Sequence, residues 1–172
     1  MFNKELIKHL ERTEKIAINF GKYLKLSSYE LKNLSNSAKY HDVGKLLIDP
    51  KILYKKEKLT NCEFNDIKGH PKFSYKILKK TEEFNDITLK AILEHHERVD
   101  GCGYPFGLKD NEISNLGKIL TICDCYEAMT AKRCYKEPFN KSKAINEIKK
   151  NLGTQFNQNL GIKFIDFTKK YL

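Results

Sequence analysis

Residues 28–45 read SYELKNLSNSAKYHDVGK, an apolar stripe at helical spacing that ends on a polar pair. Apolar side chains recur every three or four residues, which predicts one buried face of an amphipathic helix: Leu31, Leu34 and Ala38. His41 continues this spacing, so we expect its imidazole to point into the interior on the side of Ala38. Glycine commonly follows a helix, so this helix is expected to stop near Gly44. The stretch therefore predicts a helix that carries His41 and Asp42 into the protein.

The same periodicity extends outward along the whole chain, and no segment alternates in the way that predicts a strand. Further helices are expected over about residues 6–26, 61–68, 71–80, 85–96, 116–133, 140–151 and 158–171. The segment 45–60 is expected to be an irregular connection, and 100–107 a glycine-rich loop. The predicted fold class is all-α: a compact bundle of about seven helices in a single domain, residues 1–172.

The composition restricts the kind of partner. A formal net charge of +10 over 172 residues favours an anionic one. A nucleic-acid polymer is not expected, because no helix clusters arginine with aromatic side chains. No apolar run approaches the roughly 20 residues needed to cross a bilayer, and no signal peptide is recognisable. Five cysteines without a disulfide pattern fit a reducing compartment. We expect a cytoplasmic protein without membrane contact, either a monomer or a homodimer.

Histidines and acidic residues occur together at helical spacings, which is the strongest chemical signal in the chain. A single buried histidine is more often a core residue than a ligand, but here the pattern repeats along several expected helices. Imidazole and carboxylate without thiolate suit iron, manganese or zinc in hydrolytic sites. The candidate metal ligands are Glu5, His9, His41, Asp42, His70, His95, His96, Asp124 and Glu127.

The number of acids among these residues indicates more than one metal ion. Glu5, Asp42, Asp124 and Glu127 carry about four negative charges when ionised, and neutral imidazoles add none. A single divalent cation would leave such a cluster strongly anionic in a poorly solvated site. Two or three divalent cations would balance it, which suits two-metal hydrolysis. Asp42, next to His41 at a helix end, is the natural carboxylate to bridge two ions.

Two motifs carry a family resemblance. The residues His41-Asp42-Val43-Gly44-Lys45 resemble the signature of HD-superfamily phosphohydrolases. The residues from His95 to Pro105, HHERVDGCGYP, resemble the HHExxDGxGYP motif of the HD-GYP subfamily. The second motif is long and specific. Together with His70-Pro71 and Asp124-xx-Glu127-Ala128, the resemblance covers nearly the whole chain.

The HD-GYP resemblance implies a metal-dependent phosphodiesterase that hydrolyses cyclic di-GMP to pGpG, with onward hydrolysis to GMP left open. It implies two or three divalent ions, with iron or manganese favoured over zinc, nickel, magnesium and cobalt. A hydroxide that bridges the metal ions would attack the phosphorus. The implied catalytic residues are Asp42 and Lys45, and the implied substrate-binding residues are Lys45, Gly103, Tyr104, Arg133 and Lys136. The primary ions would use His41, Asp42, His70, His95, His96 and Asp124, while Glu5 and His9 match the spacing seen in members with a third ion.

Some positions depart from the family pattern. Glu127 stands where the family usually has aspartate, Cys134 where it has proline, and Ser74 where glycine is common. The longer Glu127 side chain places the geometry of a third ion in question, but no primary ligand is replaced.

Two other functions remain open at this point. One is hydrolysis of another nucleotide, such as a hybrid cyclic dinucleotide. The other is a sensor or scaffold that binds cyclic di-GMP without turnover, although such modules typically lose metal ligands and this chain keeps them all. No regulatory segment is recognisable before Met1, so regulation is expected to come from a separate protein, for example one of GGDEF type, from oligomerisation or from expression.

Overall fold

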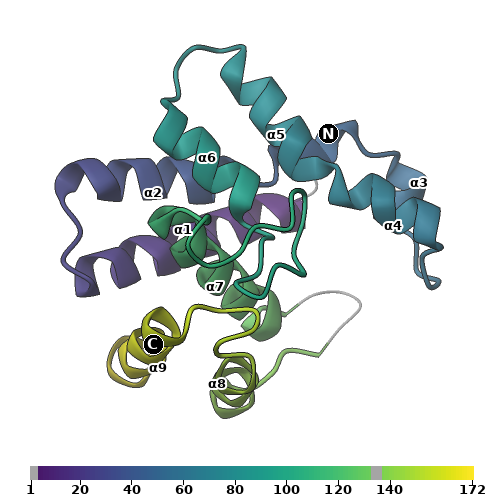
Figure 1. Ribbon diagram of the computed structural model, residues 1–172. Helices are drawn as coiled ribbons and strands as arrows, with labels where there is room; N and C mark the ends of the chain where they lie inside the picture. The colour runs from purple at the N-terminus through teal and green to yellow at the C-terminus, as the bar shows by residue number, and fades with distance from the viewer. Residues whose placement is uncertain (1–3, 133–136) are drawn as a thin grey trace.

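The computed structural model describes residues 4–132 and 137–172, and it confirms the predicted all-α class. Figure 1 shows helices joined by short connections, and these residues form no strand beyond two isolated bridges. The described part contains nine α-helices and one 3-10 helix: α1 (Lys4–Tyr23), α2 (Ser28–Tyr40), η1 (Val43–Leu47), α3 (Pro50–Leu53), α4 (Asn61–Lys68), α5 (His70–Lys79), α6 (Asp86–Glu94), α7 (Asn115–Thr130), α8 (Lys141–Lys150) and α9 (Gln158–Tyr171).

The helix count exceeds the predicted seven mainly because the segment 45–60 is more regular than expected. It contains the end of η1 and the four-residue α3, in which Pro50 occupies the first turn after the N-cap Asp49. Elsewhere the helices begin close to the predicted residues, because N-cap side chains fix their first turns. Ser27 caps α2 in a capping box with Glu30, and Asn85 caps α6.

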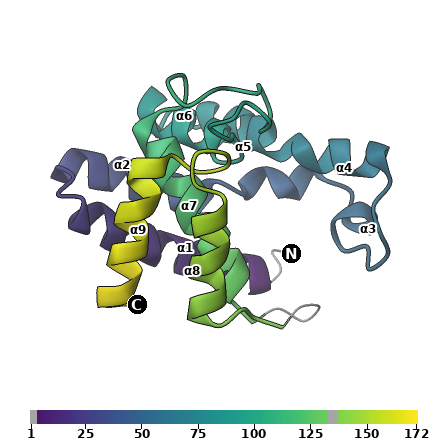
Figure 2. The same ribbon diagram turned by 60° about the horizontal axis from the view of Figure 1, so that its bottom comes forward.

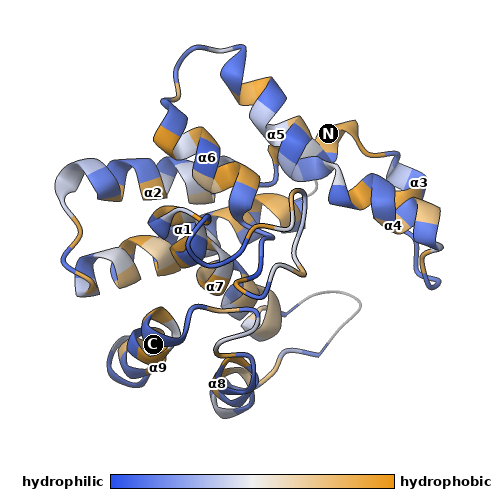
Figure 3. Ribbon diagram, in the orientation of Figure 1, coloured by the Kyte–Doolittle hydropathy of each residue, from blue (hydrophilic) through white to orange (hydrophobic). Residues whose placement is uncertain are grey.

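α7 lies at the centre of the bundle and packs against α1, α2, α6, α8 and α9. Figures 1 and 2 show it enclosed by these helices from two directions. It carries more buried residues than any other described helix, whereas α4 and α5 show alternating hydrophilic and hydrophobic residues in Figure 3. Because α7 is surrounded, polar residues on it such as Asp124 and Glu127 are necessarily held inside the protein.

Two apolar clusters stabilise the two ends of the bundle. The larger one surrounds α7 and includes the mutually packed rings of Phe20, Phe164 and Phe167. The smaller one joins α5 and α6 through Leu78, Leu89 and Ile92. Helices that contribute to these clusters, α1, α2, α5, α6 and α7, also carry or adjoin the metal-ligand candidates. None of the described helices is long and apolar enough to cross a bilayer.

Candidate metal centre

Three helix ends converge on one buried point. His41 is the C-cap of α2, His70 is the first residue of α5, and His95 is the C-cap of α6. These rings and the carboxylate of Asp42 are at most 1% exposed. The prediction that the histidine at the end of the 28–45 stripe points inward is therefore confirmed.

The three buried rings are oriented in the same way, by the main chain. Each donates its Nδ1–H to the carbonyl oxygen three residues earlier: His41 to Ala38 at 2.8 Å, His70 to Ile67 at 2.7 Å, and His95 to Ile92 at 2.6 Å. A carbonyl can only accept, so the hydrogen of each neutral ring lies on Nδ1. The Nε2 lone pairs are left to face the centre, which is the arrangement of metal-binding histidines.

Asp42 offers its two oxygens to two different groups of side chains. Oδ1 lies 3.1 Å from His70 Nε2 and 3.8 Å from His95 Nε2. Oδ2 lies 3.5 Å from His41 Nε2 and 3.6 Å from His9 Nε2, and it accepts a hydrogen bond from Lys45 Nζ at 2.5 Å. A carboxylate divided in this way could bridge two metal ions.

The close approach of η1 to α5 depends on Gly44 and Ser74. A Cβ at Gly44 would lie 2.1 Å from the carbonyl oxygen of His70, so no other residue fits there without displacing α5. Ser74 Oγ accepts from Gly44 N–H at 2.8 Å and donates to the His41 carbonyl at 2.6 Å. These contacts hold the His41–Asp42 pair against His70. Sequence reasoning treated Ser74 only as a departure from the family pattern and missed this role.

His9 enters the centre from α1 and is oriented by a side chain. Its Nδ1 contacts Glu127 Oε2, while its Nε2 lies 3.1 Å from Asp124 Oδ1. Asp124 Oδ1 is also 3.7 Å from His41 Nε2. The other oxygen of Glu127 accepts from Arg12 Nε at 2.5 Å. Arg12 was not among the predicted site residues.

Charge states in the centre follow from burial and neighbours. Burial lowers the pKa of His95 well below its usual value, and it lowers the pKa of His96 to about 3, so both rings are neutral. Burial also opposes ionisation of Asp42 and Asp124, but their cationic neighbours outweigh it, and both pKa values are well below normal. For His9, burial alone would favour the neutral ring, but the carboxylates of Asp124 and Glu127 raise its pKa to about 9.

The residues present fit metal ions. With Nδ1–H donated to a carbonyl in both rings, the Nε2 atoms of His70 and His95 face each other at 3.2 Å, and a shared cation would relieve the repulsion between two lone pairs in this arrangement. Within the described ranges, His41 Nε2 and Asp42 Oδ1 are buried without a hydrogen-bond partner. Polar atoms of this kind are normally satisfied, and a bound cation would satisfy both.

Two groups of described side chains are close enough to hold one ion each. In one group the ligand atoms of Asp42, His70, His95 and His96 lie within 4.8 Å of one another, and in the other those of His9, His41 and Asp42 do. Asp42 belongs to both groups. Neither group, in the part of the chain that the structure describes, includes Glu5, Asp124 or Glu127, although Asp124 touches the second one.

The glycine-rich loop after α6 is fixed to the metal centre by Glu97. The buried Glu97 carboxylate accepts from the amides of Phe106 at 2.7 Å and Leu108 at 3.0 Å. A Cβ at Gly103 would lie 2.4 Å from Arg98 N, so only glycine lets the loop fold back this closely. The Tyr104 ring consequently stacks on His96 at a centroid distance of 4.7 Å. Glu97 was not singled out from the sequence, because its partners are main-chain amides.

The remaining predicted site residues are placed as follows. Lys45 lies in η1 with its ammonium on Asp42, and about a quarter of its side chain is exposed. Glu5 lies in the first turn of α1, one turn before His9. Arg133 and Lys136 lie outside the described residues.

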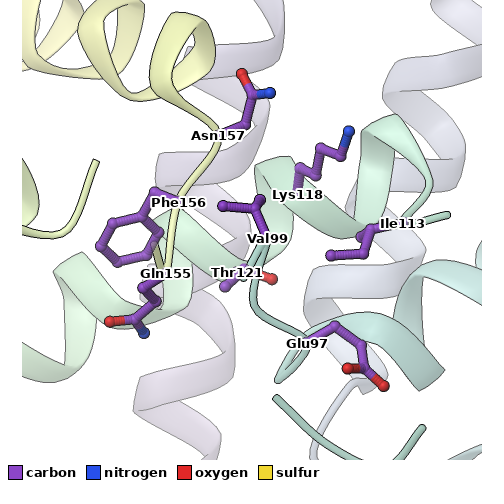
Figure 4. A pocket seen from close by; sticks show the side chains of 8 residues that line it. All are labelled: Glu97, Val99, Ile113, Lys118, Thr121, Gln155, Phe156 and Asn157. Atoms are coloured by element: carbon purple, nitrogen blue, oxygen red, sulfur yellow. The ribbon is translucent and has the colours of Figure 1, made fainter. Parts of the chain in front are cut away.

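A small, partly open cavity lies beside the loop, apart from the metal-ligand candidates. Figure 4 shows it between α7, the residues after α6 and the segment before α9. Its lining includes Val99, Thr121 and Phe156, and its volume of about 10 Å³ suffices for no more than about one water molecule. None of the predicted metal ligands lines it, so it is not the substrate site.

Comparison with known proteins connects this geometry to a family. The HD domain family model matches residues 2–160. A cyclic di-GMP phosphodiesterase of Pseudomonas aeruginosa is 39% identical over 108 residues, which cover 63% of this chain and 26% of that protein. A 3'3'-cGAMP-specific phosphodiesterase of Vibrio cholerae is 33% identical over 146 residues, which cover 85% of this chain and 32% of that protein.

The solved structures agree on the fold. An HDG"Y"P protein of Bdellovibrio bacteriovorus has a TM-score of 0.76 at 16% identity, with 95% of this chain and 52% of that chain covered. The chain spans less than half the length of the curated relatives it matches. The helical architecture, the two metal-ligand groups and the match over residues 2–160 lead to one conclusion: the chain belongs to the HD domain family.

Proposed function

We propose that this chain hydrolyses cyclic di-GMP to the linear dinucleotide pGpG in a centre that holds divalent iron or manganese. The observation that carries the proposal is the division of Asp42, whose Oδ1 faces His70 and His95 while its Oδ2 faces His9 and His41. Paired divalent ions in such a centre would lower the pKa of bound water and neutralise charge on the phosphate oxygens.

Lys45 is suited to contact the scissile phosphate. Its ammonium is anchored on Asp42 Oδ2 at 2.5 Å, and the partial exposure of its side chain leaves hydrogens for an incoming oxygen. A cation in this position would neutralise charge that builds on the phosphate during hydrolysis. It could also donate a proton to the departing 3′ oxygen.

Tyr104 and Gly103 would line the substrate side of the centre. The Tyr104 ring covers one face of His96, so a nucleotide bound over the centre would meet the tyrosine edge and the loop backbone. Burial raises the pKa of the Tyr104 phenol, so it stays protonated and can donate a hydrogen bond. Arg133 and Lys136 are proposed to hold the phosphates, on the family resemblance alone.

A hybrid cyclic dinucleotide is the second candidate substrate. It is favoured by the 33% identity to the Vibrio cholerae enzyme, whose name gives it specificity for 3'3'-cGAMP. The metal centre would contact the phosphodiester group, which cyclic di-GMP and 3'3'-cGAMP share. It therefore does not distinguish the two substrates.

The cell compartment and partners are proposed on chemical grounds. The four described cysteines are free, which suits a reducing cytoplasm, where cyclic dinucleotides would be encountered. We propose that a separate GGDEF-type protein supplies or regulates the substrate, and that the chain acts as a monomer or homodimer.

The test is turnover by purified protein loaded with manganese or with iron under anaerobic conditions. Cyclic di-GMP and 3'3'-cGAMP are supplied separately, and products are identified by chromatography. We expect pGpG from cyclic di-GMP, no product after chelation, and no product from Asp42→Asn. Asp166→Asn, an exposed aspartate on α9, is the matched control and should remain active. A fully metal-loaded protein that binds but does not hydrolyse either dinucleotide would instead be a sensor.

A further inference from the structure

We propose that the guanidinium of Arg12 takes the place of a third metal ion. The centre then holds two metal ions, although Glu5, His9 and Glu127 are residue types that could ligate a third. The inference rests on the metal centre of the proposed function. It is carried by one chain of contacts: Arg12 Nε donates to Glu127 Oε1 at 2.5 Å, and Glu127 Oε2 contacts His9 Nδ1.

Both oxygens of Glu127 are used in this arrangement. The carboxylate is 1% exposed and lies between a guanidinium and an imidazole N–H donor. Charge-assisted contacts of this kind are stronger than neutral hydrogen bonds. An incoming cation would have to compete with both of these contacts for the lone pairs of Glu127. Glu127 therefore acts as a positioning residue, which fixes the His9 ring in the way that carboxylates outside a metal's own ligand set commonly do.

The length of the Glu127 side chain explains the difference from the family pattern. Glu127 starts on α7 and spans the distance to both His9 and Arg12 on α1, which are three residues apart on one helix face. Aspartate, one methylene shorter, would not reach both partners from the same backbone position. The extra methylene of Glu127 and the presence of Arg12 therefore act together: the longer side chain is what allows Glu127 to bind Arg12 and His9 at once.

The orientation of His9 supports two ions rather than three. With Nδ1 directed at Glu127, only Nε2 is available to a metal, and it points toward Asp42 and Asp124. His9 consequently contributes to the group that contains His41 and Asp42. Its one remaining ligand atom is directed at that group and away from Glu127.

The charge balance points the same way. Of the four acids counted from the sequence, Asp42 has Lys45 as a cationic partner and Glu127 has Arg12. These two cations reduce the negative charge that is left for metal ions to offset, so the centre needs fewer divalent ions than the number of acids alone indicates.

The test counts manganese ions on the full chain without substrate, so its result does not depend on which nucleotide is hydrolysed. Metal-free protein is saturated with manganese, freed of loosely bound ions, and analysed by mass spectrometry of the element. We expect about two ions per chain in the wild type and about three in Arg12→Gln. Glu127→Asp, which cannot reach Arg12 and His9 together, should also accept about three.

Matched variants separate charge from folding. Arg12→Lys keeps the charge and should hold about two ions, while Lys15→Gln removes an exposed cation from the same helix and should also hold about two. Circular dichroism checks that each variant keeps its helices. Three ions in the wild type would overturn the proposal. So would two ions in both Arg12→Gln and Glu127→Asp, or a third ion in Arg12→Lys.

Discussion

His41, His70 and His95 are oriented by main-chain carbonyls, whereas His9 is oriented by the carboxylate of Glu127. We refer to the first three as the carbonyl-held histidines. Their orientation depends on where helices end, so substituting a neighbouring side chain does not remove their hydrogen-bond acceptors. The orientation of His9 depends on one side chain that is itself held by Arg12. The comparison shows that a side-chain substitution can change the orientation of His9 more easily than that of the carbonyl-held histidines. We call these the His9 side and the carbonyl-held side of the centre.

The largest expected effect comes from the residue that joins both sides. Asp42→Asn removes the charge that faces both groups and should lower kcat/KM for cyclic di-GMP by at least about 1000-fold, or about 4 kcal/mol. Metal content should fall as well. Both quantities are measured on the same preparation, with Asp166→Asn as the reference. Unchanged turnover would contradict the bridging role of Asp42.

The carbonyl-held side can be altered only by moving a helix end. Gly44→Ala places a methyl group against the His70 carbonyl and should push α5 away from η1. We expect the free energy of unfolding to fall by about 1–3 kcal/mol, as in other overpacked sites. Metal affinity should fall by about 10- to 100-fold. Chemical denaturation and metal titration measure the two effects, and a native affinity would show that the contact is not needed.

The His9 side can be altered by one neutral substitution. Glu127→Gln keeps the shape but removes the charge that orients His9, so we expect about tenfold weaker binding of one ion only. The ion held by His70, His95 and His96 should keep its affinity. Calorimetric titration with manganese distinguishes the two ions, and equal weakening of both would mean that the sides are not independent.

The smallest expected effect is the release of about one proton from His9 when a metal ion binds. Without metal, the raised pKa of His9, about 9, means that its protonated form stabilises the fold below the unfolded value of 6.5, and that this stabilisation is lost as the pH rises through 9. A metal ion needs the neutral ring, so uptake at about pH 7.5 should release about one proton from His9. His95 and His96, whose pKa values are lowered, should release none. Calorimetry in two buffers with different ionisation enthalpies counts the protons, and His9→Gln should release about one proton fewer than the wild type.

The sequence predicts the carbonyl-held side better than the His9 side. The 28–45 stripe places His41 inward because helical spacing holds up to the last residues of α2. At the end of α6 the stripe also places His96 inward, and His96 does join the ligand group of Asp42, His70 and His95, but spacing does not show that His95 is the more deeply buried ring. The helix stops at Glu94, and beyond that point spacing no longer fixes direction. His95 is the fully buried ring, and His96 is partly exposed beneath Tyr104.

Arg12 and Glu97 could not be identified from the sequence for different reasons. Arg12 follows His9 by three residues, but an arginine on an exposed helix face is ordinary, and its partner Glu127 is 115 residues away. Glu97 belongs to the HHExxDGxGYP motif, but its role depends on the path of the loop, which the motif does not give. Tertiary contacts between distant segments decide both.

The carbonyls that hold the three histidines also have an electrostatic consequence. Ala38, Ile67 and Ile92 lie in the last turns of α2, α4 and α6, where main-chain oxygens lack partners within the helix. The aligned peptide dipoles give each helix C-terminus about half a negative charge. The C-termini of α2 and α6 meet at the centre, whereas the C-terminus of α4 adjoins the N-terminus of α5 at His70, whose opposite dipole offsets it. The two unopposed termini produce a backbone field that attracts cations. Exchange of any single ligand leaves that field in place, and weak affinity for a cation should persist in every ligand variant that still folds.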